Sequence, residues 1–250
     1  MTAQSEFAQV ARQDGRAALV TAVAGPQAGG RLLVRADGAH EYTLGDPELD
    51  ARAVADALQL MWAERSELRG ELFIDVTAPP PRVLIFGAVE YASHLSHMAR
   101  LTGWRPYVID PRAAFATRER FPEAVEVIVS WPEAAIAQLG GLDPSSYLAI
   151  LTHDPKIDDE VLKVALAGAP AYIGAMGAKR TQAERRQRLL AAGVSEQDIA
   201  RISAPVGLDL GALSPAEVAV SILAEIIAVR HGRAGGRLSA RQGTSIHQRG

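Results

Sequence analysis

The chain has no cysteine among its 250 residues, and features that mark several protein classes are missing as well. Without a thiol there is no disulfide framework, no thiolate metal ligand and no cysteine nucleophile. No apolar run reaches the roughly 18 residues that a membrane-spanning helix needs. Residues 1–15 lack the basic start and the apolar core of a signal peptide. These absences predict a cytoplasmic protein with no membrane partner.

An excess of charge of either sign is also missing. The chain has 26 lysines and arginines against 29 aspartates and glutamates, a net charge of −3 and an isoelectric point near 6.1. Such a balance argues against nucleic acid as the main partner. With 48% hydrophobic and 22% charged residues, the composition is that of an ordinary globular protein. The length allows one large domain or two smaller ones, each with its own core.

A proline run divides the chain. Before it, the patterns predict a small α+β domain with a helix near 3–13, a helix after Asp46-Pro47, and strands near 17–23, 31–35, 41–44 and 71–76. The APPP run then interrupts regular structure, because three prolines can continue neither a helix nor a central strand. We therefore predict an N-terminal domain at 1–77, a proline-rich linker at 78–81 and a second domain at 82–232.

The second domain opens with a strand, a glycine turn, a helix and another strand. Val83–Phe86 is a short apolar run of the kind found in buried parallel strands, and Gly87 follows it directly. Apolar residues then recur at helical spacing before a second apolar run that ends in Asp110. This order is typical of the first half of a mononucleotide-binding unit.

Strands and helices keep alternating beyond that unit. Strands are predicted near 125–129, 147–151 and 171–173, and helices near 132–139, 157–167 and after Ser214. Parallel strands joined by helices form a doubly wound sheet, so the predicted fold class is α/β, with a C-terminal Rossmann-like sheet after the small α+β domain. The tail at 233–250 has four arginines, no acid and no apolar period, and is predicted to be disordered.

The glycine turn departs from the usual dinucleotide fingerprint. In G-x-G-x-x-G/A followed by an acid about 20 positions on, Gly87, Ala92 and Asp110 fill their places. Val89 replaces the second glycine, and Glu90 puts a carboxylate where a phosphate would lie. Gly87 and Asp110 are candidate ligand contacts, while NAD(P) itself is disfavoured because Glu90 repels a second anion.

A polar loop follows the strand predicted at 147–151. It contains Thr152, His153 and Asp154, whose side chains could contact a polar ligand or exchange a proton with it. The alternative is a loop histidine whose ring is merely held by Asp154. No second histidine is near in sequence, so a metal site is not expected here.

A glycine-rich basic loop follows the next strand. Gly174 and Gly177 allow close backbone approach, and Lys179 and Arg180 add two cations. Thr181 begins a capping box with the glutamate three residues on, which predicts a helix N-terminus directly after the cations. Glycines, cations and free helix N–H groups suit an anionic, phosphorylated ligand. The alternative is a solvated basic helix start, since further arginines follow.

The last loop of interest, 204–211, contains two candidate contacts, Gly207 and Asp209. Ordinary turn chemistry is the alternative for both residues. No Ser-His-Asp order, no G-x-S-x-G motif and no pair of catalytic carboxylates is present in the sequence. The chain is therefore not expected to be an enzyme.

Together these runs resemble the XdhC/CoxI family, the xanthine dehydrogenase accessory proteins. The matching runs lie within 82–232 and are VIDPR (108–112), LTHDPKIDDE (151–160), YIGAMGAKRT (172–181), APVGLDLGALSPAEVAVSILAEI (204–226) and AVRHG (228–232). The resemblance implies an N-terminal domain followed by a Rossmann-like domain. It further implies a chaperone that binds a molybdopterin-type molybdenum cofactor as cargo, protects it while its terminal sulfur is installed, and delivers it.

The implied recipient is a molybdoenzyme apoprotein of the xanthine dehydrogenase or carbon monoxide dehydrogenase type, with a cysteine desulfurase as a second partner and a homodimer as an option. With a molybdopterin as the implied ligand, the candidate residues of these loops become the predicted cofactor-binding set, and no metal ligand is predicted among them: Gly87, Asp110, Thr152, His153, Asp154, Gly174, Gly177, Lys179, Arg180, Thr181, Gly207 and Asp209.

The chain departs from the family pattern at two places. Its turn reads GAVEYA where the family has G-A-G-H-V-[AG]. Its N-terminal domain has AGPQAGG and EYTLGDPELD where the family has G-S-x-P-R and G-G-C-V-E, so a protein thiol plays no part. Two other readings stay open: an NAD(P)-dependent oxidoreductase, with which Asp110 is compatible, and a family member that has lost its cofactor and acts as a protein-interaction module.

Overall fold

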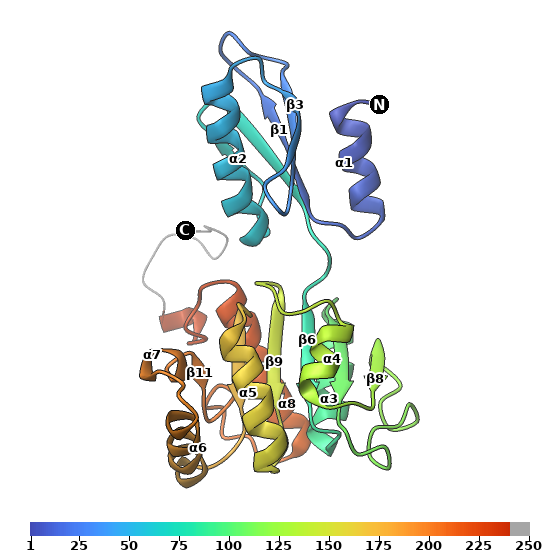
Figure 1. The fold of residues 1–250 in the computed structure, drawn as a ribbon, viewed down its shortest axis with the longest axis vertical. Helices are drawn as coiled ribbons and strands as arrows, with labels where there is room; N and C mark the ends of the chain where they lie inside the picture. Colours follow the sequence, from blue (N-terminus) through green and yellow to red (C-terminus); the bar gives the residue numbers. More distant parts are fainter. Residues whose placement is uncertain (241–250) are drawn as a thin grey trace. The chain divides into compact units, whose positions relative to one another are not determined.

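The computed structural model describes residues 1–240 and consists of two compact units, Met1–Pro80 and a second that begins at Pro81 (Figure 1). The last strand of the first unit ends at Thr77, and the first strand of the second begins at Arg82. The proline run lies between them and belongs to neither sheet. No helix among the described residues is both long enough and apolar enough to span a membrane.

The first unit is an antiparallel sheet with one helix on each face. Its elements are α1 (Ala3–Arg12), β1 (Ala17–Ala22), β2 (Arg31–Arg35), β3 (His40–Thr43), α2 (Pro47–Trp62), β4 (Glu67–Arg69) and β5 (Leu72–Thr77), and the strand order is β3-β2-β1-β5-β4. The alternation of β1 explains the layers: Leu19 packs with Phe7 of α1, whereas Ala18 and Val20 pack with Leu60 of α2.

The second unit is a six-stranded, fully parallel sheet. Its elements are β6 (Arg82–Phe86), α3 (Glu90–Leu101), β7 (Arg105–Ile109), β8 (Glu126–Ile128), α4 (Pro132–Gln138), β9 (Ser146–Ile150), α5 (Pro155–Ala167), β10 (Tyr172–Ala175), α6 (Lys179–Ala191), α7 (Glu196–Ile199), β11 (Ile202–Ser203) and α8 (Pro215–Arg230). The strand order is β11-β10-β9-β6-β7-β8. The chain therefore winds outward in both directions from β6, and the topological switch point lies between β6 and β9.

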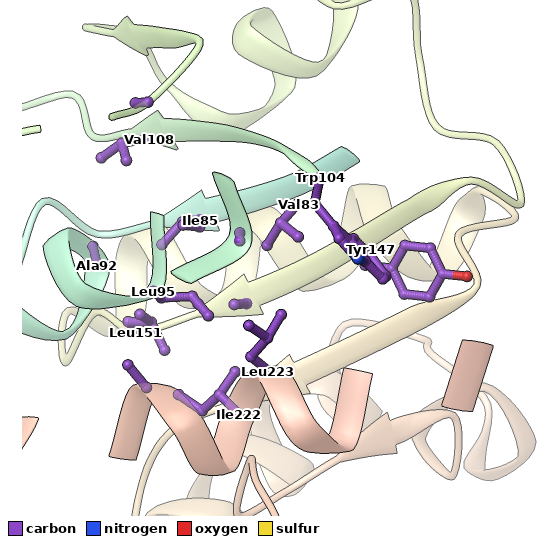
Figure 2. Packing of buried hydrophobic residues seen from close by; sticks show 14 of the residues in the cluster. Val83, Ile85, Ala92, Leu95, Trp104, Val108, Tyr147, Leu151, Ile222 and Leu223 are labelled. Atoms are coloured by element: carbon purple, nitrogen blue, oxygen red, sulfur yellow. The ribbon is translucent and has the colours of Figure 1, made fainter. Parts of the chain in front are cut away.

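Helices cover both faces of this sheet. On one face α3 and α8 pack together, and Figure 2 shows Leu95 of α3 and Ile222 and Leu223 of α8 gathered against the strands. Trp104 and Tyr147 meet edge to face in the same cluster, with ring centroids 4.8 Å apart. The opposite face is covered by α4, α5 and α6. Burying such side chains contributes about 1.5–3 kcal/mol each.

The predicted fold class is confirmed, with local differences. The patterns did not predict the short elements β4, α7 and β11. The capping box predicted at Thr181 is wrong: the N-cap of α6 is Ala178, three residues earlier, and its side chain cannot cap the helix. The predicted tail is described as far as Ala240, where Leu238–Ala240 form a 3-10 turn; its remainder, 241–250, lies outside the described residues.

Candidate functional site

The loops predicted to bind a ligand all leave the carboxyl edge of the parallel sheet. Strands β6, β9, β10 and β11 are neighbours, so the loops after them lie side by side, beginning at the switch point. Backbone hydrogen bonds join them: the Leu151 N–H donates to the carbonyl of Phe86 at 2.8 Å, and the Val206 N–H donates to the carbonyl of Ala175 at 3.1 Å. The topology thus brings the predicted segments to one edge.

Gly87 forms the tight turn after β6. Its φ of +110° is a conformation that side-chain-bearing residues rarely adopt. A Cβ at this position would lie 2.9 Å from the backbone nitrogen of Thr152, so the neighbouring loop already fills the space beside it. Val89 is the N-cap of α3 and packs against the core, and Glu90 is the first residue of that helix. Glu90 therefore stands at the helix N-terminus, as predicted.

Asp110, predicted as a ligand contact, is fully buried and serves the glycine turn instead. Its Oδ2 accepts the Ala88 N–H at 2.8 Å and Arg112 Nη2 at 2.7 Å, while its Oδ1 accepts the Arg112 N–H at 2.9 Å and Nε at 2.8 Å. A carboxylate offers about four acceptor positions, and all are used here. Burial raises the pKa of Asp110, but the hydrogen bonds from Arg112 and Ala88 outweigh burial and leave it below its ordinary value.

The loop after β9 is held by its own polar groups. Thr152 is buried, and its hydroxyl donates to Asp158 Oδ1 at 2.8 Å and accepts the Asp154 N–H at 2.9 Å. The Asp154 carboxylate accepts the Lys156 N–H at 2.9 Å and so caps α5. His153 is exposed between them. Of the three predicted contacts, His153 therefore faces solvent, while Thr152 supports the loop from inside.

A buried ion pair joins this loop to the next. Asp158 of α5 and Arg185 of α6 lie 2.8 Å apart, and their side chains are 5% and 3% exposed. Burial raises the pKa of Asp158 above its ordinary value, although the hydrogen bonds from Thr152 and Arg185 oppose that change. Arg185 also donates to the carbonyl of Met176 at 3.0 Å. Arg185, one of the further arginines behind the alternative of a solvated basic helix start, is thus an internal residue.

The N-terminus of α6 differs from the other helix starts at this edge. Asp154 caps α5. The starts of α3 and α4 have no side-chain cap either, but each has a glutamate in its first turn. The start of α6 has no cap and no acid, and Lys179 and Arg180 are its first two residues. Within residues 1–240, this is the only α-helix that combines these properties, which favour an anion.

The side chains around this helix start are mostly exposed. Lys179, Arg180 and Thr181 face solvent, and Arg180 pairs with Glu184 one turn on, with 2.9 Å between Nε and Oε1. Gly177 has a φ of +128° and turns the chain from β10 into α6. Gly174 lies inside β10 and not after it, and the space that its missing side chain leaves is taken by Tyr172 and Val206. Gly174 was predicted to allow close approach of a ligand to the backbone; in the structure it instead allows Tyr172 and Val206 to pack against the strand.

The loop 204–211 is anchored to α8. Glu225 accepts the Gly207 N–H at 2.6 Å and the hydroxyl of Tyr172. Burial, followed by the hydrogen bond to Glu225, raises the pKa of that phenol. Gly207, with a φ of +104°, packs against Ser221, whereas Asp209 is exposed. Gly207 is thus tied into the fold, and Asp209 is free to meet solvent or a ligand.

The predicted residues fall into two groups. One group is buried within the turns and builds them: Gly87, Asp110, Thr152 and Gly174. The other is exposed or half-exposed along the edge: His153, Asp154, Gly177, Lys179, Arg180, Thr181, Gly207 and Asp209. The described residues contain no group of three histidine, cysteine or acidic side chains that could hold a metal ion.

Sequence reasoning missed the internal polar residues Asp158, Arg185 and Glu225. A usable pattern was present. Asp158 lies three and four residues before Val161 and Leu162 on the apolar stripe of α5, and all three are buried. A charge on an apolar stripe needs a buried partner, since charged residues are almost never fully buried unless paired.

Comparison with known proteins places these elements in context. The family model described as the XdhC Rossmann domain matches residues 83–226. A Bacillus subtilis protein named as a probable subunit of xanthine dehydrogenase is 33% identical over 64% of this chain and 46% of its own length. The Escherichia coli molybdenum cofactor insertion chaperone PaoD is 30% identical over 61% of this chain and 41% of its own.

Two further similarities extend over most of the chain. Escherichia coli YqeB is 27% identical over 89% of this chain and 44% of its own length. A Bacillus halodurans crystal structure described as a xanthine dehydrogenase has a TM-score of 0.61, covering 94% of this chain and 65% of that one at 23% identity. At this identity the likeness shows the fold alone. The chain spans less than half the length of the curated relatives it matches.

Proposed function

The chain belongs to the XdhC family, and from this we propose that it is an accessory protein that carries a molybdopterin-type molybdenum cofactor. It protects the bound cofactor and delivers it, in the cytoplasm, to a molybdoenzyme of the xanthine dehydrogenase or carbon monoxide dehydrogenase type. It acts as a carrier, not an enzyme, and a cysteine desulfurase and a second copy of the chain are its further proposed partners. The names of the Bacillus subtilis and PaoD relatives support the molybdenum part of the proposal.

The observation that carries the proposal is the start of α6. A molybdopterin bears a phosphate, and this helix start offers backbone N–H groups, two cations and no competing carboxylate in its first turn. Gly177 exposes the backbone just before the helix. We assign the phosphate to Gly177 and the first turn of α6, with Lys179 and Arg180 as its charged contacts.

The exposed ion pair of Arg180 and Glu184 does not prevent Arg180 from binding a phosphate. The Arg180 side chain is 90% exposed, and exposed ion pairs contribute at most about 1 kcal/mol. A phosphate that also receives helix N–H groups can therefore displace Glu184 from Arg180. His153, Asp154, Thr181 and Asp209 are exposed or half-exposed along the same edge and are assigned to the rest of the cofactor.

The test compares two arginines of the same helix. Arg180→Ala removes a proposed phosphate contact. Arg186→Ala removes an exposed arginine farther along α6, which pairs with Glu196 of α7. A charge-assisted hydrogen bond contributes about 1.5–3 kcal/mol, and 1.4 kcal/mol is a factor of ten. Arg180→Ala should therefore weaken molybdopterin binding by roughly ten- to a hundredfold, and Arg186→Ala by less than about twofold.

Affinity is measured by titration calorimetry at matched salt, with thermal unfolding of each variant as the check on folding. Neither substitution should lower the melting temperature appreciably, because both arginines lie on the surface. Equal affinities of the wild type and Arg180→Ala would refute the assignment of the phosphate to α6. Equal losses in both variants would mean that only overall charge matters.

A further inference from the structure

The buried ion pair of Asp158 (α5) and Arg185 (α6) is hydrogen-bonded to both loops of the proposed site. On the α5 side, Asp158 accepts the Thr152 hydroxyl at 2.8 Å, and that hydroxyl holds the Asp154 N–H at 2.9 Å. These bonds fix the loop 152–154 directly after β9. The Asp158 carboxylate therefore helps to hold the backbone of residues 152–154, which lies beside the proposed ligand.

On the α6 side, hydrogen bonds hold the turn at residues 176–177 in a similar way. Arg185 donates from Nη2 to the Met176 carbonyl at 3.0 Å and from Nη1 to Gln182 Oε1 at 2.5 Å. Gln182 in turn donates to the Gly177 carbonyl at 2.9 Å. Arg185 thus holds the turn that precedes the first helical N–H groups of α6.

Stability alone does not account for a charged pair at this place. Two charges are expensive to bury, and an apolar pair of similar volume often holds two helices together as well or better. Among the described residues, Arg185 Nε is in addition buried without a hydrogen-bond partner, which is a further cost. What an apolar pair cannot do is hold the Thr152 hydroxyl and the Met176 carbonyl in fixed positions.

We propose that Asp158 and Arg185 are positioning residues that set the spacing between the loop 152–154 and the Gly177 turn. Ligand affinity at the start of α6 then depends on an ion pair that the ligand never touches. The inference rests on the proposed function for the identity of the ligand, but the positions of the two loops can be tested without any ligand.

The decisive variant is the double replacement Asp158→Leu with Arg185→Met. A matched control exists on the same two helices, where Asp159 and Arg188 form a half-exposed pair with 2.6 Å between Oδ2 and Nε. The control variant is Asp159→Leu with Arg188→Met. Three quantities are compared with the wild type: melting temperature, amide hydrogen exchange, and affinity for molybdopterin.

The Asp158/Arg185 double variant should keep a melting temperature within a few degrees of the wild type. It should exchange amide hydrogens faster in peptides covering 150–156 and 175–184, and its cofactor affinity should fall at least about tenfold. The control double variant should change neither exchange in these peptides nor affinity. Asp158→Asn, which keeps the side-chain shape but removes the charge, should lose about threefold in affinity.

A folded Asp158/Arg185 double variant with wild-type exchange and wild-type affinity would overturn the positioning role. If that variant does not fold, the same two measurements on Asp158→Asn decide, and wild-type values there overturn the role equally. A wild-type protein that binds no molybdopterin would refute the proposed function, and faster exchange of both loops in the double variant would still support the positioning role.

Discussion

Replacing Asp110 with alanine should destabilise the second unit, because this residue supports the glycine turn at the centre of the sheet. Its carboxylate is fully buried and accepts four hydrogen bonds, one from the Ala88 N–H and three from Arg112. The two donors differ in whether water can replace the hydrogen bonds that they lose in the variant. Arg112 has a half-exposed side chain and can turn to water, whereas the Ala88 N–H is buried and would be left without a partner.

The expected magnitude follows from that difference. An unsatisfied buried donor costs about 1–3 kcal/mol, and hydrogen bonds to a charged group contribute about 1.5–3 kcal/mol. Allowing for recovery of the Arg112 bonds by water, Asp110→Ala should cost roughly 2–4 kcal/mol. For a domain of this size, 1 kcal/mol corresponds to about 2–4 °C in melting temperature. A decrease of about 4–16 °C is therefore expected.

Thermal and urea unfolding of the two variants Asp110→Ala and Asp209→Ala provide the measurement. Asp209 is an exposed aspartate in the loop 204–211, and its replacement should change stability by less than about 0.5 kcal/mol. If Asp110→Ala were as stable as the wild type, Asp110 would not support the turn. The role first predicted for it, a direct contact with the ligand, would then be favoured again.

Two further predictions follow from the same turn. The pKa of Asp110 lies below its ordinary value, so the stability that its carboxylate contributes is present above about pH 4 and is lost as the pH falls through the lowered value. The difference in unfolding free energy between wild type and Asp110→Asn should therefore shrink on acidification from about pH 6 to about pH 2. A difference that does not change with pH would contradict this prediction. NAD and NADP should not bind with micromolar affinity in titration calorimetry, because Glu90 stands at the start of α3 and the acceptor positions of Asp110 are all used. Micromolar binding of either dinucleotide would mean that the turn can accept a pyrophosphate despite Glu90.

The sequence predicted the fold well where local patterns and tertiary packing agree. The apolar run Val83–Phe86, the glycine after it and the capping box at Ser214 all became the expected elements. The failures lie where the pattern was weak. β11 has only two residues. α6 begins after Ala178 without a capping side chain, whereas the sequence pattern places the helix start at Thr181, the first residue there that can cap a helix.

The site was predictable as a set of loops but not in its internal structure. Alternation of strands and helices brings the loops after β6, β9 and β10 to one edge, and sequence alone supports that step. Which partner each buried acid takes is decided largely by segments far apart in the sequence. Asp110 binds Arg112, which is only two residues on, but it also accepts the N–H of Ala88 from the turn after β6. Asp158 of α5 pairs with Arg185 of α6. The contacts with Ala88 and with Arg185 cannot be predicted from local spacing.

The central claim, that this chain carries a molybdopterin-type cofactor, is tested most directly by native mass spectrometry of the purified full chain. The protein is incubated with molybdopterin and passed through a desalting column before measurement. The predicted result is a mass increase of one molybdopterin per chain, retained by Arg186→Ala and largely lost by Arg180→Ala. A spectrum showing only the mass of the protein alone, at cofactor concentrations well above micromolar, would contradict the claim.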